Sequence, residues 1–449
     1  MIFVKDKSFY KTVLSLSLPI ALQNLITTGV SMMDTVMLGA LGEVQLSAAS
    51  LAGQVSFIFM IFNFGIASGT GVLTAQYWGK GDVTAIKHIM ASMYRLSFAV
   101  AAVMMLASLI FPVQIMSVFS HEPQVVAEGV KYLQIIAFTY LMYGVTITSI
   151  GVLRTVGTVK ISLVVYSISF VTNVFFNWVF IYGNLGAPRL EIRGAALGTL
   201  IARVTEFVVI MFFMRFKEKK ICFRLKDILY TDEGRSAEFR RTATPVALNE
   251  LIWSSGVAML SVIMGQMGSV VVAANSICQV VVQFVSVFFQ GVGNAAAVII
   301  GNTIGQGRYK DAEDRAKTFL SISLLLGIVA GALMLLVKPI AINFYNVSEL
   351  TKQVANQIMT ISAGVVVFQS VAMITVVGTL RGGGDVRFGL FIDVIFLWMI
   401  AIPLGFLTGL KLGLPVAVVY FCIKIDEFLK SILCFVRIYS EKWLRDLTR

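Results

Sequence analysis

The sequence of 449 residues contains few of the residues on which most enzymes and disulfide-rich proteins depend. It has two histidines and four cysteines, and neither set shows metal-ligand spacing. Charged residues make up 13% of the chain, whereas soluble domains contain about one-quarter. No H-E-x-x-H, G-x-S-x-G or G-x-x-x-x-G-K-[ST] motif occurs. These absences argue against disulfides, a zinc site, hydrolase chemistry and ATP hydrolysis in this chain. We therefore expect no enzyme activity and no cofactor.

Long apolar runs are what the chain has in abundance. Hydrophobic residues make up 57% of it, and the mean hydropathy is +0.86. A run of about twenty apolar residues can cross a bilayer as a helix. The sequence therefore predicts an all-α integral membrane protein with about twelve transmembrane helices. We place them at 12–38, 45–77, 88–111, 127–152, 159–182, 192–214, 242–267, 271–303, 316–337, 353–379, 388–408 and 413–437.

Lysine and arginine in the loops predict the orientation of these helices. If both termini are cytoplasmic, most of these lysines and arginines lie on the cytoplasmic side of the membrane. The most basic loop, 215–241, then lies on that side as well. The net charge of +12 then faces anionic lipid, so we expect the bilayer as a partner and no nucleic acid. The first apolar run is too long for a cleavable signal peptide and should remain as a helix. We expect a multi-pass protein of the plasma (inner) membrane.

Self-comparison at a shift of 226 residues reveals an internal repeat. The segment GVLRTVGTVK (151–160) also matches GTLRGGGDVR (378–387), which pairs Arg154 with Arg381. The repeat predicts two pseudo-symmetric six-helix lobes, 1–214 and 242–449, joined by a cytoplasmic basic linker at 215–241. Such repeats occur in secondary transporters, although a duplicated bundle without a transport role is an alternative. The matching pairs include Pro19 and Pro245, Leu22 and Leu248, Gly39 and Gly265, Gly65 and Gly291, and Gly79 and Gly305.

Three long segments of the chain resemble a known family of transporters. PIALQNLITTGVSMMDTVMLGALGEVQLSAASL (19–51), NVFFNWVFIYGNLGAPRLEIRGAALGTLIAR (173–203) and TLRGGGDVRFGLFIDVIFLWMIAIPLGFL (379–407) look like segments of the bacterial multidrug and toxin extrusion (MATE) transporters. The resemblance implies two lobes, alternating access, and export of organic cations or amphipathic drugs against a proton or sodium gradient. Substrate identity does not follow from it.

Asp34 is the leading candidate for cation coupling. A charge at the centre of a membrane helix costs about 2.5–3.5 kcal/mol on insertion scales, so it usually marks a functional site. Gln23, Thr27, Ser31 and Asp34 are spaced by four, four and three residues, which places them on one helical face that we expect to line a wet cavity. The matching aspartate is associated with cation coupling in the family, and sodium near Asp34 is one possibility. The alternative is a hydrogen-bonded aspartate that serves packing.

Two amides on the fifth predicted helix, Asn173 and Asn177, are candidate cavity residues. They share a face with Ser169, and family members commonly have Asn and then Asp at the two positions. Asn177 cannot carry a proton, but its carbonyl oxygen can coordinate sodium or bind substrate. The alternative is that both amides only join helices. On the next helix, Arg203 and Glu206 are three residues apart and are expected to form an ion pair.

The second lobe contributes a different set of polar residues. Glu250 is the second candidate for cation coupling, because family members also carry a carboxylate in this register. Ser370 stands where sodium-coupled relatives often have an aspartate. Near the C-terminus, Lys424 with Glu427 and Asp426 with Lys430 are expected to pair along one helix. The expected cavity residues of this lobe are Asn275, Gln279 and Gln283, which share one face of a helix with Ser286, Gln290 and Asn294, and Asp393 on a later helix.

These features predict a monomeric secondary antiporter. It would exchange protons or sodium for small amphipathic or cationic molecules by alternating access. One alternative is a flippase for lipid-linked precursors, which would need a broader cationic cavity. A second alternative is a membrane-embedded enzyme, against which the scarcity of histidine and the missing motifs argue.

Overall fold

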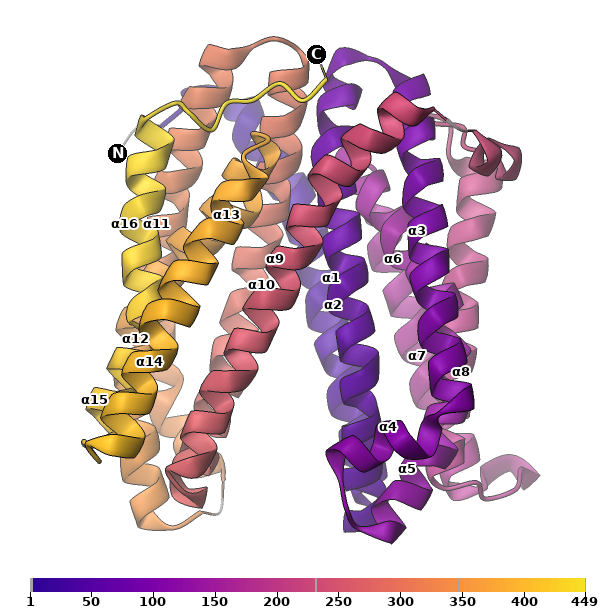
Figure 1. Cartoon of the computed structure of the whole chain (residues 1–449), viewed down its shortest axis with the longest axis vertical. Coiled ribbons are helices and arrows are strands. Elements are labelled where there is room, and N and C mark those ends of the chain that lie inside the picture. The colour runs from indigo at the N-terminus through magenta and orange to yellow at the C-terminus, as the bar shows by residue number, and fades with distance from the viewer. Residues whose placement is uncertain (1–2, 231, 346, 449) are drawn as a thin grey trace. The chain divides into compact units, whose positions relative to one another are not determined.

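The computed structural model describes residues 3–230, 232–345 and 347–448, and every regular element in these ranges is a helix (Figure 1). Ten of the helices are long and apolar enough to cross a membrane, and the pair α5 (Pro123–Ile136) and α6 (Thr139–Thr155), bent by 53°, adds an eleventh span. The remaining predicted span divides at Lys424 into α15 (Val416–Ile423) and α16 (Ile425–Tyr439). The all-α membrane fold predicted from the sequence is confirmed.

Contacts within the chain define two compact units. Unit 2 consists of Leu22–Thr74 and Asp82–Ala247, and unit 1 consists of Met1–Ala21, Ala75–Gly81 and Leu248–Arg449. Three long helices therefore contribute to both units, since each passes from one to the other within its length. These helices are α1 (Lys7–Gly39), α2 (Glu43–Lys80) and α9 (Glu233–Gln266), and the last begins inside the predicted linker.

Unit 2 holds the helices that position the first candidate site. Local signals explain where several of them begin and end. Asp82 caps α3 by accepting a hydrogen bond from the amide of Ala85 over 2.9 Å, and Gly183 ends α7 with a φ of 76°. Prolines start α4 and α5, where the missing N–H costs nothing. The further elements are α3 (Val83–Ile110), α4 (Pro112–Phe119), α7 (Lys160–Tyr182), the short turn Asn184–Gly186, α8 (Ile192–Phe212), a π-helical turn at Phe213–Lys217 and a 3₁₀ turn at Leu225–Leu229.

Unit 1 packs its helices around an apolar core that includes Leu260, Phe289, Ile358, Leu397 and Ile423. Several of its helices contain π-helical segments, which in other proteins often mark functional sites. The elements are α10 (Ser269–Gly305), α11 (Tyr309–Phe344), α12 (Glu349–Met373) with a π-helical continuation at Ile374–Leu380, α13 (Val386–Asp393) continuing through Val394–Ala401, α14 (Ile402–Gly405) and Phe406–Lys411, and then α15 and α16.

The 226-residue offset of the sequence repeat also relates contacts inside unit 1. A Cβ atom at Gly79 would lie 2.1 Å from the backbone oxygen of Asn302, and one at Gly305 would lie 1.9 Å from that of Gln76. Gly79 and Gly305 differ by 226 positions, and so do Gln76 and Asn302. Both glycines are therefore required because a neighbouring backbone passes directly over them.

Candidate cation and substrate site

Asp34 is joined to two other helices of unit 2 through a row of hydrogen bonds. The side-chain nitrogen Nδ2 of Asn177 donates to Oδ1 of Asp34 over 2.6 Å and to Oδ1 of Asn173 over 3.2 Å. Asn173 Nδ2 donates in turn to Oγ1 of Thr199 over 3.3 Å. The row thus runs from α1 through α7 to α8. Asn173 and Asn177 lie one helical turn apart on α7, which is why both can take part.

The oxygen of the Asn177 amide is buried and has no hydrogen-bond partner within the described part of the chain. It lies against Gly198 of α8, where an added Cβ atom would come within 2.1 Å of it. Gly198 therefore provides the space that this oxygen occupies. A buried carbonyl oxygen without a partner is costly, so a cation or a donor group supplied at this point would be favourable.

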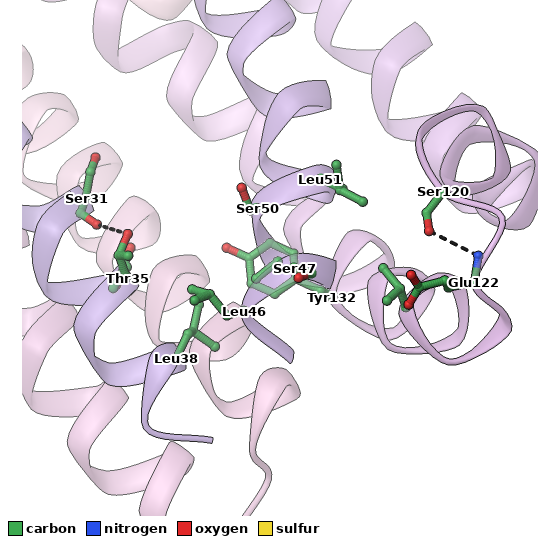
Figure 2. Close-up of a pocket in the computed structure, with 13 residues that line it drawn as sticks. Ser31, Thr35, Leu38, Leu46, Ser47, Ser50, Leu51, Ser120, Glu122 and Tyr132 are labelled. Atoms are coloured by element: carbon green, nitrogen blue, oxygen red, sulfur yellow. Dashed lines mark hydrogen bonds between the residues drawn. The ribbon is translucent and has the colours of Figure 1, made fainter. Parts of the chain in front are cut away.

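A pocket of about 690 Å³ lies beside this row of hydrogen bonds, and Figure 2 shows its lining. Hydroxyl groups and leucine side chains both contribute to the lining, and Asp34 and Glu122 make it acidic. Such a lining offers both apolar contact and hydrogen bonds, which suits small amphipathic molecules. The residues are Ser31, Asp34, Thr35 and Leu38 from α1, Leu46, Ser47, Ala49, Ser50 and Leu51 from α2, and Ser120, Glu122, Val125 and Tyr132.

The polar face of α1 divides between two environments. Ser31 and Asp34 line the pocket, whereas Gln23 is buried and its Oε1 accepts a hydrogen bond from Arg154 over 2.6 Å. Thr27 bonds within its own helix, to the backbone oxygen of Asn24 over 2.9 Å. The four residues share a face of α1, but the structure brings only Ser31 and Asp34 to the pocket.

Arg203 and Glu206 form the ion pair expected from their spacing. One guanidinium nitrogen lies 2.8 Å and 2.9 Å from the two carboxylate oxygens. The guanidinium also lies 4.5 Å from the ring centroid of Tyr143, and Ser169 donates to Glu206. Ser169 therefore binds this ion pair, although it shares a helical face with Asn173 and Asn177.

Both candidate carboxylates of unit 1 are buried in ion pairs. Oε1 of Glu250 lies 2.6 Å from a guanidinium nitrogen of Arg381. Oδ1 of Asp393 lies 2.8 Å from the Lys430 ammonium, which is also 3.0 Å from Asp426. Buried pairs of this kind neutralise charge that the membrane interior would otherwise disfavour.

The expected pair of Asp426 with Lys430 is present, but that of Lys424 with Glu427 is not found among the described residues. The charges of Lys424 and Glu427 still interact, but no salt bridge joins the two among the described residues, because the helix breaks at Lys424. Lys424 joins α15 to α16 with φ −97° and ψ 4°, so the regular three-residue spacing does not continue through it.

The amides of α10 remain on one face, as their spacing requires. Asn275 and Gln279 are half-buried and Gln283 is exposed, and none of the three bonds to another helix in the ranges the structure describes. The oxygen of the Asn275 amide is buried without a partner. Nδ2 of Asn294 donates to the backbone oxygen of Gln290 over 2.8 Å. The side chains of Asn275, Gln279 and Gln283, which bond to no other helix in the described ranges, are available to water or a ligand.

Of the residues that line the pocket, sequence reasoning singled out only Ser31 and Asp34. Glu122 and Tyr132 line the pocket from α5 and the loop before it, and no pattern in the sequence indicates their direction. The contact of Arg154 with Gln23 was also missed. The repeat gave a signal for it, because it pairs Arg154 with Arg381, and both arginines contact the first helix of their half.

Comparisons with known proteins agree on one family. A sequence model of the MatE family matches residues 19–179 and 245–407. The chain is 28% identical to the probable multidrug resistance protein NorM of Agrobacterium fabrum, over 96% of this chain and 93% of that protein. It is 25% identical to the multidrug resistance protein MdtK of Yersinia enterocolitica, over 89% and 88%. It is also 22% identical to the uncharacterized transporter YisQ of Bacillus subtilis, over 98% and 96%.

Solved structures show the same fold. A crystal structure of MATE in complex with MaL6 superposes with a TM-score of 0.87 at 17% identity, covering 96% of this chain and 97% of that one. A multidrug resistance MATE family transporter of the MOP superfamily, in an outward-facing conformation, gives 0.87 at 18% identity, covering 96% of each chain. With a family model matching most of its length and relatives aligned over nearly all of it, the chain belongs to the MATE family of membrane transporters.

Proposed function

We propose that this protein is a secondary antiporter that exports small organic cations or amphipathic compounds in exchange for protons or sodium ions. The relatives named as multidrug resistance proteins support the substrate class. The mixed hydroxyl and leucine lining of the acidic pocket supports it independently. The protein would work as a monomer in the plasma membrane with both termini in the cytoplasm.

The hydrogen bond between Asn177 and Asp34 carries the proposal. It connects a carboxylate in the wall of the pocket to the buried amides of α7. A hydrogen bond to an ionised carboxylate is about twice as strong as one between neutral groups. Neutralising Asp34 by a proton or a sodium ion would therefore loosen the connection of α1 to α7. Ion binding and helix packing would then be coupled at a single residue.

The groups around Asp34 fit a monovalent cation. The row of hydrogen bonds that begins at the Asp34 carboxylate also contains the side-chain oxygens of Asn173, Asn177 and Thr199, and hard cations prefer oxygen ligands. The amide oxygen of Asn177 has no hydrogen-bond partner within the described residues. A proton would instead bind to Asp34 alone, since Asn177 has no acidic group. A sodium ion would therefore need oxygen ligands from several of these residues, whereas a proton would need only Asp34.

The position of the pocket suggests the direction of transport. Its lining begins at Ser31 and includes Leu46 beyond the end of α1, so it lies at the end of α1 opposite Lys7. With a cytoplasmic N-terminus, that end faces outward. An ion entering from outside would reach Asp34, neutralise it and favour release of substrate. One unit charge moved through 100 mV supplies about 2.3 kcal/mol, which is enough for modest concentrative export.

The second lobe would contribute to transport through two kinds of polar group. Three amides of α10 are available to water or substrate, and the carboxylates are held in ion pairs. Asn275, Gln279 and Gln283 would line a wet surface, because their amides bond to no other helix in the described ranges. Glu250 would act through its ion pair with Arg381, whose separation would release a carboxylate for a cation. Asp393 would change its charge only together with Lys430.

Efflux from proteoliposomes tests the proposal. Wild-type protein should export a fluorescent organic cation when a proton gradient or a sodium gradient is imposed alone, and the effective gradient identifies the ion. Asp34→Asn should abolish gradient-driven efflux. Asp311→Asn, which alters an exposed ion pair with Arg308, is the matched control and should transport normally. Full gradient-driven efflux by Asp34→Asn would show that the coupling site lies elsewhere.

A further inference from the structure

The chain beyond α16, residues 440–448, is bound closely to unit 1. In Figure 1 it is the yellow coil that leaves the upper end of α16. Trp443 is fully buried, and its indole Nε1 donates to the backbone oxygen of Ile438 over 3.1 Å. Segments that flank a helical domain are usually poorly ordered unless tertiary contacts hold them. The contacts of the 440–448 segment therefore call for an explanation.

Three consecutive glycines of unit 1 form the surface on which this segment lies. The amide of Arg445 donates to the backbone oxygen of Gly383 over 2.8 Å. A Cβ atom at Gly383 would lie 2.3 Å from the ring of Trp443, and one at Gly384 would lie 2.7 Å from the backbone oxygen of Arg445. These two glycines are therefore required because the 440–448 segment passes directly over them.

The same segment binds the last turns of α2. The side-chain amide of Gln76 contacts its backbone in two places, since Nε2 donates to the oxygen of Arg445 over 3.0 Å and Oε1 accepts from the amide of Leu447 over 2.8 Å. The ammonium of Lys80 donates to the backbone oxygen of Thr448 over 2.9 Å. Gln76 is fully buried. These three hydrogen bonds attach the end of α2 to the 440–448 segment.

The internal repeat places a matching contact in unit 2. Arg154 and Arg381 are 227 positions apart, and so are Val156 and Gly383. The backbone oxygen of Val156 accepts a hydrogen bond from Lys220, which lies in the linker that follows α8. In each half, the segment after the last helix thus returns to the same loop. In unit 1 the segment also binds α2, and most of α2 belongs to unit 2.

This division of α2 gives the contact a mechanical consequence. Residues 43–74 belong to unit 2, whereas residues 75–81 belong to unit 1. Successive spans cross a membrane in opposite directions, so Gln76 and Lys80 lie on the cytoplasmic side if the N-terminus does. Alternating access requires one bundle to move against the other. Movement of unit 2 that opens the cytoplasmic side would therefore pull the end of α2 away from the 440–448 segment.

We infer that the 440–448 segment is a cytoplasmic latch that holds the end of α2 in unit 1 and must release it during each transport cycle. The inference rests on the proposed export function and adds a conformational step to it. Gln76 and Lys80 bind only backbone atoms of the segment. Their own side chains therefore determine how strongly the latch holds.

Reversible cross-linking of the segment to α2 tests the inference. In a background that carries Cys222→Ser and Cys422→Ser, the pair Lys80→Cys and Thr448→Cys is joined by a short bis-methanethiosulfonate reagent. Intact mass spectrometry confirms the cross-link, and efflux from proteoliposomes is measured before joining, after joining and after reduction. Joining should abolish gradient-driven efflux, and reduction should restore it. Full efflux in the joined state would overturn the inference.

The matched control joins the same segment to a helix that lies wholly in unit 1. The hydroxyl of Tyr309, on α11, donates to Oδ2 of Asp446 over 3.1 Å. The pair Tyr309→Cys and Asp446→Cys, joined by the same reagent, should transport normally because neither side has to move. Loss of efflux in both joined pairs would also contradict the inference, since the movement would then not lie between the segment and α2.

Hydrogen exchange provides a second test that does not depend on transport. The amide of Leu447 donates to Gln76, and such an amide exchanges only when its bond opens. Gln76→Leu should raise the exchange rate of peptide 443–448 about tenfold, the factor expected when these buried bonds are lost. Gln54→Leu, at an exposed position of the same helix, is the matched control and should leave that rate unchanged. An unchanged rate for Gln76→Leu would show that α2 does not hold the segment.

The two measurements separate this inference from the proposed function. Efflux that is present under an ion gradient but insensitive to the cross-link between α2 and the segment would contradict the latch alone. A protein that shows the expected exchange rates but exports no organic cation under any ion gradient, before joining as well as after it, would contradict the proposed function.

Discussion

Asn177 donates to Asp34 over 2.6 Å and so joins α7 to α1 at the wall of the acidic pocket. The bond has a neutral donor and an acceptor whose charge can change, so its strength depends on whether a cation or proton is bound. If the proposed function is right, this contact would connect ion binding to helix packing.

Asn177→Leu should lower gradient-driven efflux about tenfold or more, because it removes a hydrogen bond to a charged group while nearly conserving volume. Asn343→Leu, an exposed amide on α11, is the matched control and should transport normally. Initial rates in proteoliposomes, normalised to the amount of reconstituted protein, give the comparison. Equal rates for the two variants would mean that the contact of Asn177 with Asp34 plays no part in transport.

Gly198→Ala should impair transport although it replaces no polar side chain. Its new methyl would lie 2.1 Å from the amide oxygen of Asn177, and the backbone nitrogen of the same residue is 3.0 Å away, so Asn177 must move. Gly53→Ala, where nothing lies within 4 Å, should be tolerated and should stabilise α2 by about 0.5–1 kcal/mol. Thermal unfolding and efflux should both separate the two variants. Normal efflux by Gly198→Ala would show that the site tolerates a displaced Asn177.

The ion pair of Glu250 with Arg381 should behave as a single unit in stability measurements. Glu250→Gln or Arg381→Gln alone leaves one buried charge, at a cost of about 3–5 kcal/mol. The double variant should be more stable than the less stable single variant, because no unpaired charge remains. Chemical or thermal unfolding in detergent provides the four values of the cycle. Additive losses would show that the two residues do not interact energetically.

Lys430→Met should destabilise unit 1 by about 3–5 kcal/mol, because it leaves Asp393 and Asp426 buried without their shared cation. Lys352→Met is the matched control, since Lys352 pairs with Glu349, whose side chain is 81% exposed, and such pairs contribute less than about 1 kcal/mol. Protein yield and the unfolding midpoint measure the difference. A Lys430→Met protein as stable as the control would show that the carboxylates become neutral at little cost.

The sequence predicted the elements of this fold well because each depends on local composition. Apolar runs of sufficient length mark the spans, and the two halves of the repeat carry identical residues at several positions under a shift of 226 residues. The ion pairs of Arg203 with Glu206 and of Lys430 with Asp426 also followed from helical spacing. The salt bridge expected between Lys424 and Glu427 did not form, because arguments from helical spacing hold only while the helix is continuous.

Sequence alone also singled out Asp34, Asn173 and Asn177, because a charge or an amide inside an apolar run is visible without a structure. What it could not supply were the partners. Asp34 and Asn177 are 143 positions apart, and Gln23 and Arg154 are 131 apart. Helical periodicity gives the face on which a side chain lies, but only the packing of helices decides which side chains meet across it. For that reason the tertiary structure decided that Asp34 meets an amide, that Glu250 meets an arginine, and that Arg154 meets no carboxylate within the described residues.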